Sequence, residues 1–173
     1  MQPEYRNVAT TRRRFLKTSV AAALAVPTVV PSRVLGAAAP SNRVHVGLIG
    51  CGHQSQRIVP SFLVHDDVQM LAVCDVNRRG VGYYYPDQVL GCETARQWVD
   101  ERYGQQTASG RFKGCDAYND FREIVNRSDI DAFAIVVPDH WHALIAIAAL
   151  RAGKDVYCEK PLALTVRQGR RMV

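Results

Sequence analysis

Apolar runs of strand length alternate with helix-length stretches along residues 43–173. Uninterrupted apolar runs are typical of strands buried on both faces, whereas apolar positions repeated at helical spacing indicate amphipathic helices. We therefore predict strands at 44–49, 68–75, 116–118, 132–137 and 155–158. We predict helices at 54–63, 89–103, 121–126 and 142–152, and a further helix that begins near Thr165. Pro60 lies inside the first helix and predicts a kink or an early end there.

This alternation of strands and helices, with short connections, predicts how the elements are arranged. It is typical of a parallel sheet whose crossover helices cover both faces. We therefore expect the α/β class, with a Rossmann-type doubly wound parallel sheet. Ligands of such sheets bind at the carboxyl ends of the strands. Gly50, Asp75, Pro138 and Glu159 all stand at such ends, so we expect four separate segments to line one crevice.

The first of these ends carries a glycine turn, Gly50-Cys51-Gly52, which follows an apolar run directly. Closely spaced glycines let the backbone turn tightly and approach a pyrophosphate, and the next helix offers its unpaired N–H groups to the phosphates. Asp75 closes the second strand, where a carboxylate can accept hydrogen bonds from an adenosine ribose diol. This pattern favours NAD as the cofactor. Arg78 and Arg79 could attract a 2′-phosphate, which leaves NADP open.

Charge separates the chain into two parts. The 173 residues carry a net charge of +6, which by itself would suggest a basic protein. Residues 1–39 hold six of the 22 Lys and Arg and one of the 16 Asp and Glu, so residues 40–173 have a net charge of only +1. The basic excess is therefore local to the leader, and we expect no nucleic-acid partner.

The leader has the three regions of an export signal. Arg12, Arg13 and Arg14 precede an apolar stretch at 18–30, and small residues follow at 34–39. The apolar stretch has 13 residues and contains a proline, whereas a membrane-spanning helix needs about 20. We predict a twin-arginine signal peptide at 1–39, the twin-arginine export machinery as a partner, a periplasmic location and no stable membrane span. A plain basic terminus and an uncleaved, membrane-anchored leader are the alternatives.

The cysteines number five, an odd count without regular spacing, which is not the pattern of a disulfide framework. The sequence has neither a C-x-x-C motif nor a His/Cys cluster with zinc spacing. We therefore expect no metal site.

Two motifs follow the last two predicted strands, at 138–142 and 159–161. The first would place the imidazoles of His140 and His142 beside a nicotinamide or a ribose. The second would place the Lys160 ammonium at the mouth of the crevice, where it could polarise a substrate hydroxyl that loses hydride. Each motif also has a purely structural interpretation: packing and helix capping for the histidines, and a solvated turn for the lysine.

Taken together, these segments resemble the Gfo/Idh/MocA family, which is named for glucose–fructose oxidoreductase, inositol dehydrogenase and a rhizopine-catabolism protein. The resemblance is greatest to the exported, twin-arginine-led branch and covers nearly all of residues 43–173. The matching segments are 47–52, 72–77, 118–122, 138–142 and 156–162. Ser55 stands at the position of the third glycine of the turn and is small enough for helix–strand packing.

The resemblance implies roles for particular residues. The cofactor-binding residues it implies are Gly50, Cys51, Gly52, His53 and Gln54 at the pyrophosphate, Asp75 at the adenosine ribose, Pro138, His140 and His142 along the nicotinamide half, and Glu159. Lys160 is the implied catalytic residue and would face the substrate carbon that loses hydride. The peptide bond from Lys160 to Pro161 is expected to be cis, as is common in the family.

The activity implied by the resemblance is an NAD(P)-dependent oxidoreductase that transfers hydride between the nicotinamide and a secondary hydroxyl of a sugar or polyol. The alternatives are an NAD-dependent glycoside hydrolase of the same superfamily, a non-catalytic dinucleotide-binding fragment, and a secreted structural protein with a Rossmann core. Family members continue into a C-terminal α/β substrate domain that supplies further catalytic groups and the oligomer interface. We expect that domain to be missing here, with 40–173 as a truncated NAD(P)-binding domain of low activity. A homo-oligomer is expected for a full-length form.

Overall fold

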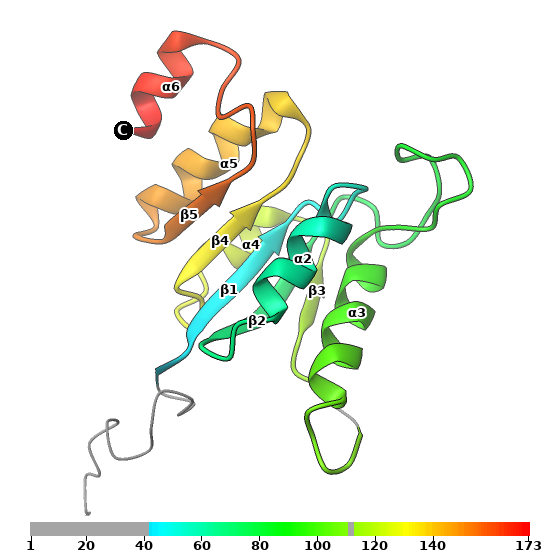
Figure 1. Ribbon diagram of the computed structural model, residues 1–173. Coiled ribbons are helices and arrows are strands. Elements are labelled where there is room, and N and C mark those ends of the chain that lie inside the picture. The colour runs from blue at the N-terminus through cyan, green and yellow to red at the C-terminus, as the bar shows by residue number, and fades with distance from the viewer. Residues whose placement is uncertain (1–41, 111–112) are drawn as a thin grey trace, which may run out of the picture. The chain divides into compact units, whose positions relative to one another are not determined.

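The computed structural model of the protein describes residues 42–110 and 113–173 (Figure 1). The predicted signal peptide at 1–39 lies outside the described residues. The elements are β1 (Val44–Ile49), α2 (Ser55–Leu63), β2 (Val68–Cys74), α3 (Cys92–Gly104), β3 (Asp116–Tyr118), α4 (Phe121–Ile124), β4 (Ala132–Ile135), α5 (Asp139–Arg151), β5 (Asp155–Cys158) and α6 (Val166–Met172).

The strands form one parallel sheet in the order β3-β2-β1-β4-β5. Side chains alternate between its two faces, as the pleat requires. Leu48 packs with the buried residues of α2 and α3, whereas the next residue, Ile49, packs with those of α4 and α5. Helices therefore cover both faces of the sheet (Figure 1), and the predicted doubly wound α/β arrangement is confirmed.

At Gly47 in β1, the centre of the sheet is packed too tightly for a side chain. Gly47 in β1 faces Phe133 of the neighbouring strand β4, and a Cβ placed on Gly47 would lie 2.4 Å from the Phe133 ring. Phe133 has no exposed surface. The glycine thus makes room for the largest of the fully buried side chains described.

Helix boundaries differ from the sequence prediction by more than one residue at three places. Helix α3 begins at Cys92 rather than 89, because Leu90 exchanges two backbone hydrogen bonds of 2.9 Å with Gly80 and Gly91 takes a φ of +121°. Helix α5 begins at Asp139, three residues earlier than predicted, and α4 ends at Ile124. Of the kink or early end predicted at Pro60, the early end is not observed, because this proline is exposed on α2 and the helix continues to Leu63.

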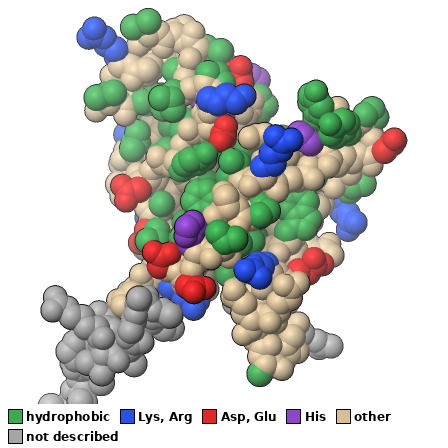
Figure 2. Space-filling model, in the orientation of Figure 1, with side chains coloured by type: hydrophobic (Ala, Val, Ile, Leu, Met, Phe, Trp, Pro, Cys, Tyr) green, Lys and Arg blue, Asp and Glu red, His purple; other side chains and the backbone are tan. Residues whose placement is uncertain are grey.

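The surface shows no segregation of charge on the face drawn in Figure 2, where basic and acidic side chains are interspersed. None of the described helices is both long and apolar enough to cross a lipid bilayer.

A hydrogen bond between a helix and a strand yields the first testable prediction. The Tyr103 hydroxyl at the end of α3 accepts a 2.9 Å bond from the backbone N–H of Met70, a fully buried residue of β2. Tyr103→Phe would leave this N–H without that partner, so we expect the free energy of unfolding to fall by about 1–3 kcal/mol. Urea denaturation measures the change. Tyr84→Phe is the matched control, because Tyr84 is 73% exposed and its loss of a hydroxyl should cost less than about 0.5 kcal/mol.

Candidate functional site

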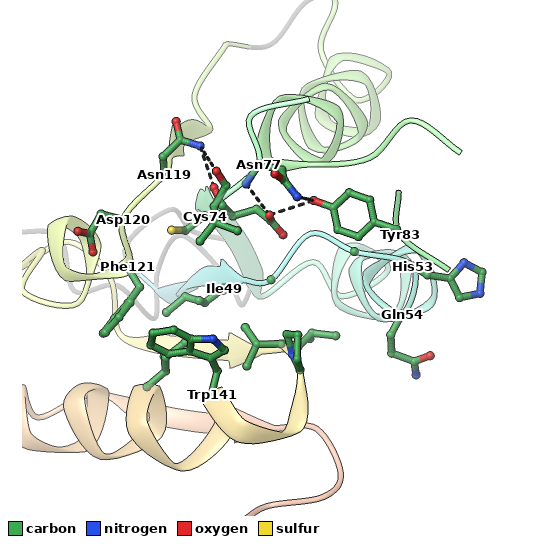
Figure 3. Close-up of a pocket in the computed structure, with 18 of the residues that line it drawn as sticks. Ile49, His53, Gln54, Cys74, Asn77, Tyr83, Asn119, Asp120, Phe121 and Trp141 are labelled. Carbon is green, nitrogen blue, oxygen red and sulfur yellow. Dashed lines mark hydrogen bonds between the residues drawn. The ribbon is translucent and has the colours of Figure 1, made fainter. Parts of the chain in front are cut away.

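A cavity of about 510 Å³ lies at the carboxyl ends of β1, β2 and β4 (Figure 3). It is lined by the glycine turn after β1, by the end of β2 and the segment that follows it, by the β3–α4 connection, and by the start of α5. Because β1 lies between β2 and β4, this is the point at which the strand order reverses, where open α/β sheets bind their ligands. The predicted crevice is therefore present, but only three of the four expected segments line it: Glu159 lies outside the lining.

Gly50 brings these strand ends together. Its φ is +98°, its N–H donates a 2.8 Å hydrogen bond to the Cys74 carbonyl, and a Cβ at this position would lie only 2.1 Å from the Val136 carbonyl oxygen. Neither the backbone conformation nor the space admits a side chain. The first glycine of the motif is thus explained by close packing among β1, β2 and β4.

Three consecutive backbone N–H groups at the start of α2 border the cavity. They belong to Gly52, His53 and Gln54, and the described part of the chain provides no hydrogen-bond acceptor for any of them. Ser55, at the third glycine position, is fully buried and donates through Oγ to the Gly52 carbonyl at 2.6 Å. Unpaired N–H groups at a helix N-terminus bind phosphate oxygens well.

Asp75 is one of two acidic residues that line the cavity, with Asp120, and it is linked to the glycine turn. Its Oδ2 accepts a 2.7 Å hydrogen bond from the backbone N–H of Cys51. Its Oδ1 accepts from the backbone N–H of Asn77 at 2.8 Å and from the Tyr83 hydroxyl at 2.9 Å. An ionised carboxylate has about four acceptor positions, so one position remains available for a ligand hydroxyl.

Tyr83 is a cavity residue to which the sequence analysis assigned no role. Its ring packs against Gly52, because a Cβ on that glycine would lie 3.1 Å from the Tyr83 Cδ1. Its hydroxyl also accepts a 3.2 Å bond from the side-chain amide of Asn77. Burial is the main cause of a raised pKa for Tyr83, which keeps the hydroxyl protonated and able to donate. The only sequence signal was a run of three tyrosines in a loop.

The side chain of His53 points away from the cavity (Figure 3). Its ring stacks on Tyr84 with 5.1 Å between centroids, and its Nδ1 lies 3.1 Å from the side-chain oxygen of Gln88. His53 therefore offers only its backbone to the cavity, and its predicted contact with a pyrophosphate stays a prediction.

The opposite wall of the cavity is aromatic. Phe121 of α4 and Trp141 of α5 face the same space, with 6.4 Å between their ring centroids (Figure 3). Asn119 fixes the nearby β3–α4 connection by donating a 2.8 Å bond to the Asp75 carbonyl. This wall suits a planar ring such as adenine or nicotinamide.

The remaining predicted residues lie outside the cavity lining. These are Cys51, His140, His142, Glu159 and Lys160. His142 is 1% exposed, and its Nδ1 hydrogen-bonds to the Pro161 carbonyl. His142 therefore contacts the Glu159–Pro161 loop with its buried ring. Because a carbonyl only accepts, Nδ1 carries the proton. The Lys160–Pro161 bond is cis, which confirms that prediction.

The Glu159–Pro161 loop nevertheless begins close to the cavity. The Glu159 N–H donates a 3.0 Å hydrogen bond to the carbonyl of Ile135, the residue directly before Val136 of the cavity wall. The Glu159 carboxylate accepts a 2.8 Å bond from the Tyr157 hydroxyl. Lys160 is exposed. The catalytic and cofactor roles assigned to these residues stay predictions.

All five cysteines are free. Burial raises the pKa of the Cys74 thiol and of the Cys115 thiol to about 12, and it raises the pKa of Cys51 strongly. Thiols with raised pKa values are poor nucleophiles at neutral pH. The chemistry of the site therefore does not rest on cysteine.

Comparison with known proteins agrees with this geometry. Residues 91–173 match the GFO_IDH_MocA model, described as "Oxidoreductase family, NAD-binding Rossmann fold". A "Glycosyl hydrolase family 109 protein" of Shewanella pealeana is 31% identical over 174 residues, which cover 90% of this chain and 34% of that protein. An "Alpha-N-acetylgalactosaminidase" of Shewanella oneidensis is 32% identical over 136 residues, or 78% of this chain and 26% of that protein.

Two solved structures show the same fold. A putative myo-inositol dehydrogenase from Sinorhizobium meliloti has a TM-score of 0.55 and 25% identity, covering 75% of this chain and 31% of its own. The WlbA dehydrogenase from Bordetella pertussis, solved with NADH and UDP-GlcNAcA, has a TM-score of 0.54 and 23% identity, covering 76% and 33%. The chain thus spans about a third of the length of these proteins.

The glycine turn yields the second prediction. Gly50→Ala would force an alanine into a φ of +98° and place its Cβ against the Val136 carbonyl, so we expect a loss of at least about 2 kcal/mol of unfolding free energy. Gly80→Ala is the control, because a Cβ there meets nothing within 4 Å. Urea denaturation compares the two variants, and equal stabilities would contradict the account of Gly50.

Proposed function

We propose that the chain, as a member of the Gfo/Idh/MocA oxidoreductase family whose model matches its residues 91–173, supplies the cofactor half of a hydride-transfer site for a secondary hydroxyl of a sugar or polyol. The observation that carries the proposal is the row of three N–H groups at 52–54, which have no acceptor among residues 42–110 and 113–173 and line the same cavity as Asp75 at the switch point of the sheet. A dinucleotide needs both a phosphate cradle and a ribose acceptor.

The residues present fit NAD. The N–H groups of 52–54 would hold the pyrophosphate, Asp75 would accept from the adenosine ribose, and the wall formed by Phe121 and Trp141 would contact a planar ring. The nicotinamide supplies the acceptor for the hydride. NADP remains the alternative cofactor.

Lys160 is proposed to act at the substrate oxygen. It directly follows Glu159, whose N–H donates to the Ile135 carbonyl at the end of β4, and an ammonium can donate a hydrogen bond to a hydroxyl and polarise it. The cis Lys160–Pro161 bond and the contact between His142 and the Pro161 carbonyl define the conformation of this loop. His142 would then act on the site by holding the loop.

A second candidate function is favoured by the names of the curated relatives, which are glycosyl hydrolase family 109 proteins and an alpha-N-acetylgalactosaminidase. In an NAD-dependent glycoside hydrolase the sugar is oxidised transiently, the aglycone is eliminated, water adds in its place, and the hydride returns to the sugar in the same turnover. The same cofactor domain serves both reactions, so its geometry alone does not separate them.

Export to the periplasm through the twin-arginine machinery is also part of the proposal, as is a homo-oligomer for a full-length form. The argument for export is the arginine-led, apolar and small-residue order of residues 1–39.

Cofactor binding is the third prediction. We expect NAD to bind the purified chain saturably and to raise its melting temperature, since a ligand of the folded state stabilises it. Gly52→Asp would add a carboxylate beside the proposed phosphate site and should weaken NAD binding at least about tenfold. Gly80→Asp, on an open surface, should bind like the wild type. Calorimetric titration of the three proteins measures this, and equal affinities would contradict the proposed cradle.

The redox balance of the reaction is the fourth prediction, and it separates the two candidate functions. We expect the 173-residue chain to bind NAD but to turn over little alone. Joined to a substrate domain, a dehydrogenase forms one NADH per oxidised hydroxyl, whereas a hydrolase releases the aglycone with no net NADH. A nitrophenyl N-acetylgalactosaminide assayed for nitrophenol and NADH together distinguishes them, and rapid turnover by the isolated chain would contradict the first expectation.

A further inference from the structure

The Tyr83 hydroxyl donates a hydrogen bond to Asp75, the proposed acceptor for the adenosine ribose. Its loop is fixed at both ends: Gly80 and Leu90 exchange backbone hydrogen bonds, and the N–H of Gly91 donates to the Cys51 carbonyl at 3.3 Å. The Tyr83 ring packs on Gly52, and its hydroxyl reaches Asp75 Oδ1 at 2.9 Å. Tyr83 is therefore positioned by backbone contacts and by packing as well as by its bond to Asp75.

The acceptor capacity of Asp75 is nearly used up by the protein itself. Oδ1 already accepts from two donors, the Asn77 N–H and the Tyr83 hydroxyl, and Oδ2 accepts from the Cys51 N–H. Two of these donors are backbone groups fixed by the turn and the strand end. Tyr83 is thus the side-chain donor of the three, and one acceptor position is left for a ligand.

We propose that Tyr83 is a specificity-determining residue of this site: its hydroxyl takes the acceptor position on Asp75 that a second ribose hydroxyl would need, and so limits the preference for NAD over NADP. The inference rests on the proposed binding of a dinucleotide. An adenosine ribose with two free hydroxyls can donate twice to one carboxylate, whereas a 2′-phosphorylated ribose has a single hydroxyl left to donate. With Tyr83 present, Asp75 can accept one hydrogen bond from the ribose of NAD and likewise one from the 2′-phosphorylated ribose of NADP.

Asp75 is the acceptor through which Tyr83 would affect the choice of cofactor, and the exposed Arg79 is the same in the wild type and in Tyr83 variants. A 2′-phosphate would lie near the Asp75 carboxylate and gain from a nearby cation. Arg78 is engaged by Glu93, with 2.6 Å between Nη2 and Oε1. Releasing the second acceptor position on Asp75 would therefore strengthen the binding of NAD and leave that of NADP unchanged.

The test is the affinity of the intact chain for each cofactor, measured by calorimetric titration of NAD and NADP. Tyr83→Phe removes the hydroxyl and keeps the ring on Gly52; Tyr83→Leu is a second variant that keeps an apolar side chain. We expect either variant to bind NAD about five- to tenfold more tightly, the worth of one hydrogen bond, with NADP within about twofold of the wild type. Tyr84→Phe, which changes a neighbouring exposed ring, should alter neither affinity.

The outcomes separate this proposal from the proposed function. If the wild type binds NAD and the Tyr83 variants bind it equally or more weakly, Tyr83 orients Asp75 rather than competing for it, and only the present proposal is overturned. An equal gain for NAD and NADP would also overturn it. If neither variant melts cooperatively, Tyr83 is a structural residue and the proposal fails. If neither the wild type nor any variant binds a dinucleotide, the proposed function and this inference fall together.

Discussion

The contact between Gly50 and the Val136 carbonyl is the constraint on which the site depends. A Cβ at Gly50 would lie 2.1 Å from that oxygen, so β1 and β4 can meet at their carboxyl ends only through a residue without a side chain. The turn that results directs the chain into α2 and leaves the N–H groups of 52–54 without partners at its start. A side chain at Gly50 would therefore disturb the sheet and the phosphate cradle together.

The second constraint is the bond from the Cys51 N–H to Asp75 Oδ2. It connects the glycine turn to the end of β2, so the acceptor for the ribose and the donors for the pyrophosphate are positioned by one set of contacts. The carboxylate thus has a structural task besides its proposed binding task. Substitution of Asp75 would change the shape of the turn as well as the chemistry of the cavity, and the two effects can be separated only by measuring stability and affinity on the same variant.

Much of this architecture could be predicted from the sequence, because strands buried on both faces produce apolar runs and the glycine turn has a fixed spacing. The start of α3 could not, since it depends on the backbone bridge between Gly80 and Leu90. Nor could the start of α5, which lies directly after Pro138 rather than at His142. Tyr83 was not identified because loop conformation places it, and loop conformation leaves no periodic signal. The motif around Lys160 was recognised, but its side chain stands outside the cavity lining.

The buried cysteines have a consequence for how this domain responds to oxidants. Cys51, Cys74, Cys92 and Cys115 are enclosed by the packing of the domain, and all five thiols are free. Burial opposes formation of the thiolate, which is the species that reacts with oxidants and attacks disulfides. The four buried thiols of the folded domain should therefore be slow to oxidise, whereas Cys158, which is half-buried, is the thiol that an oxidant would reach first.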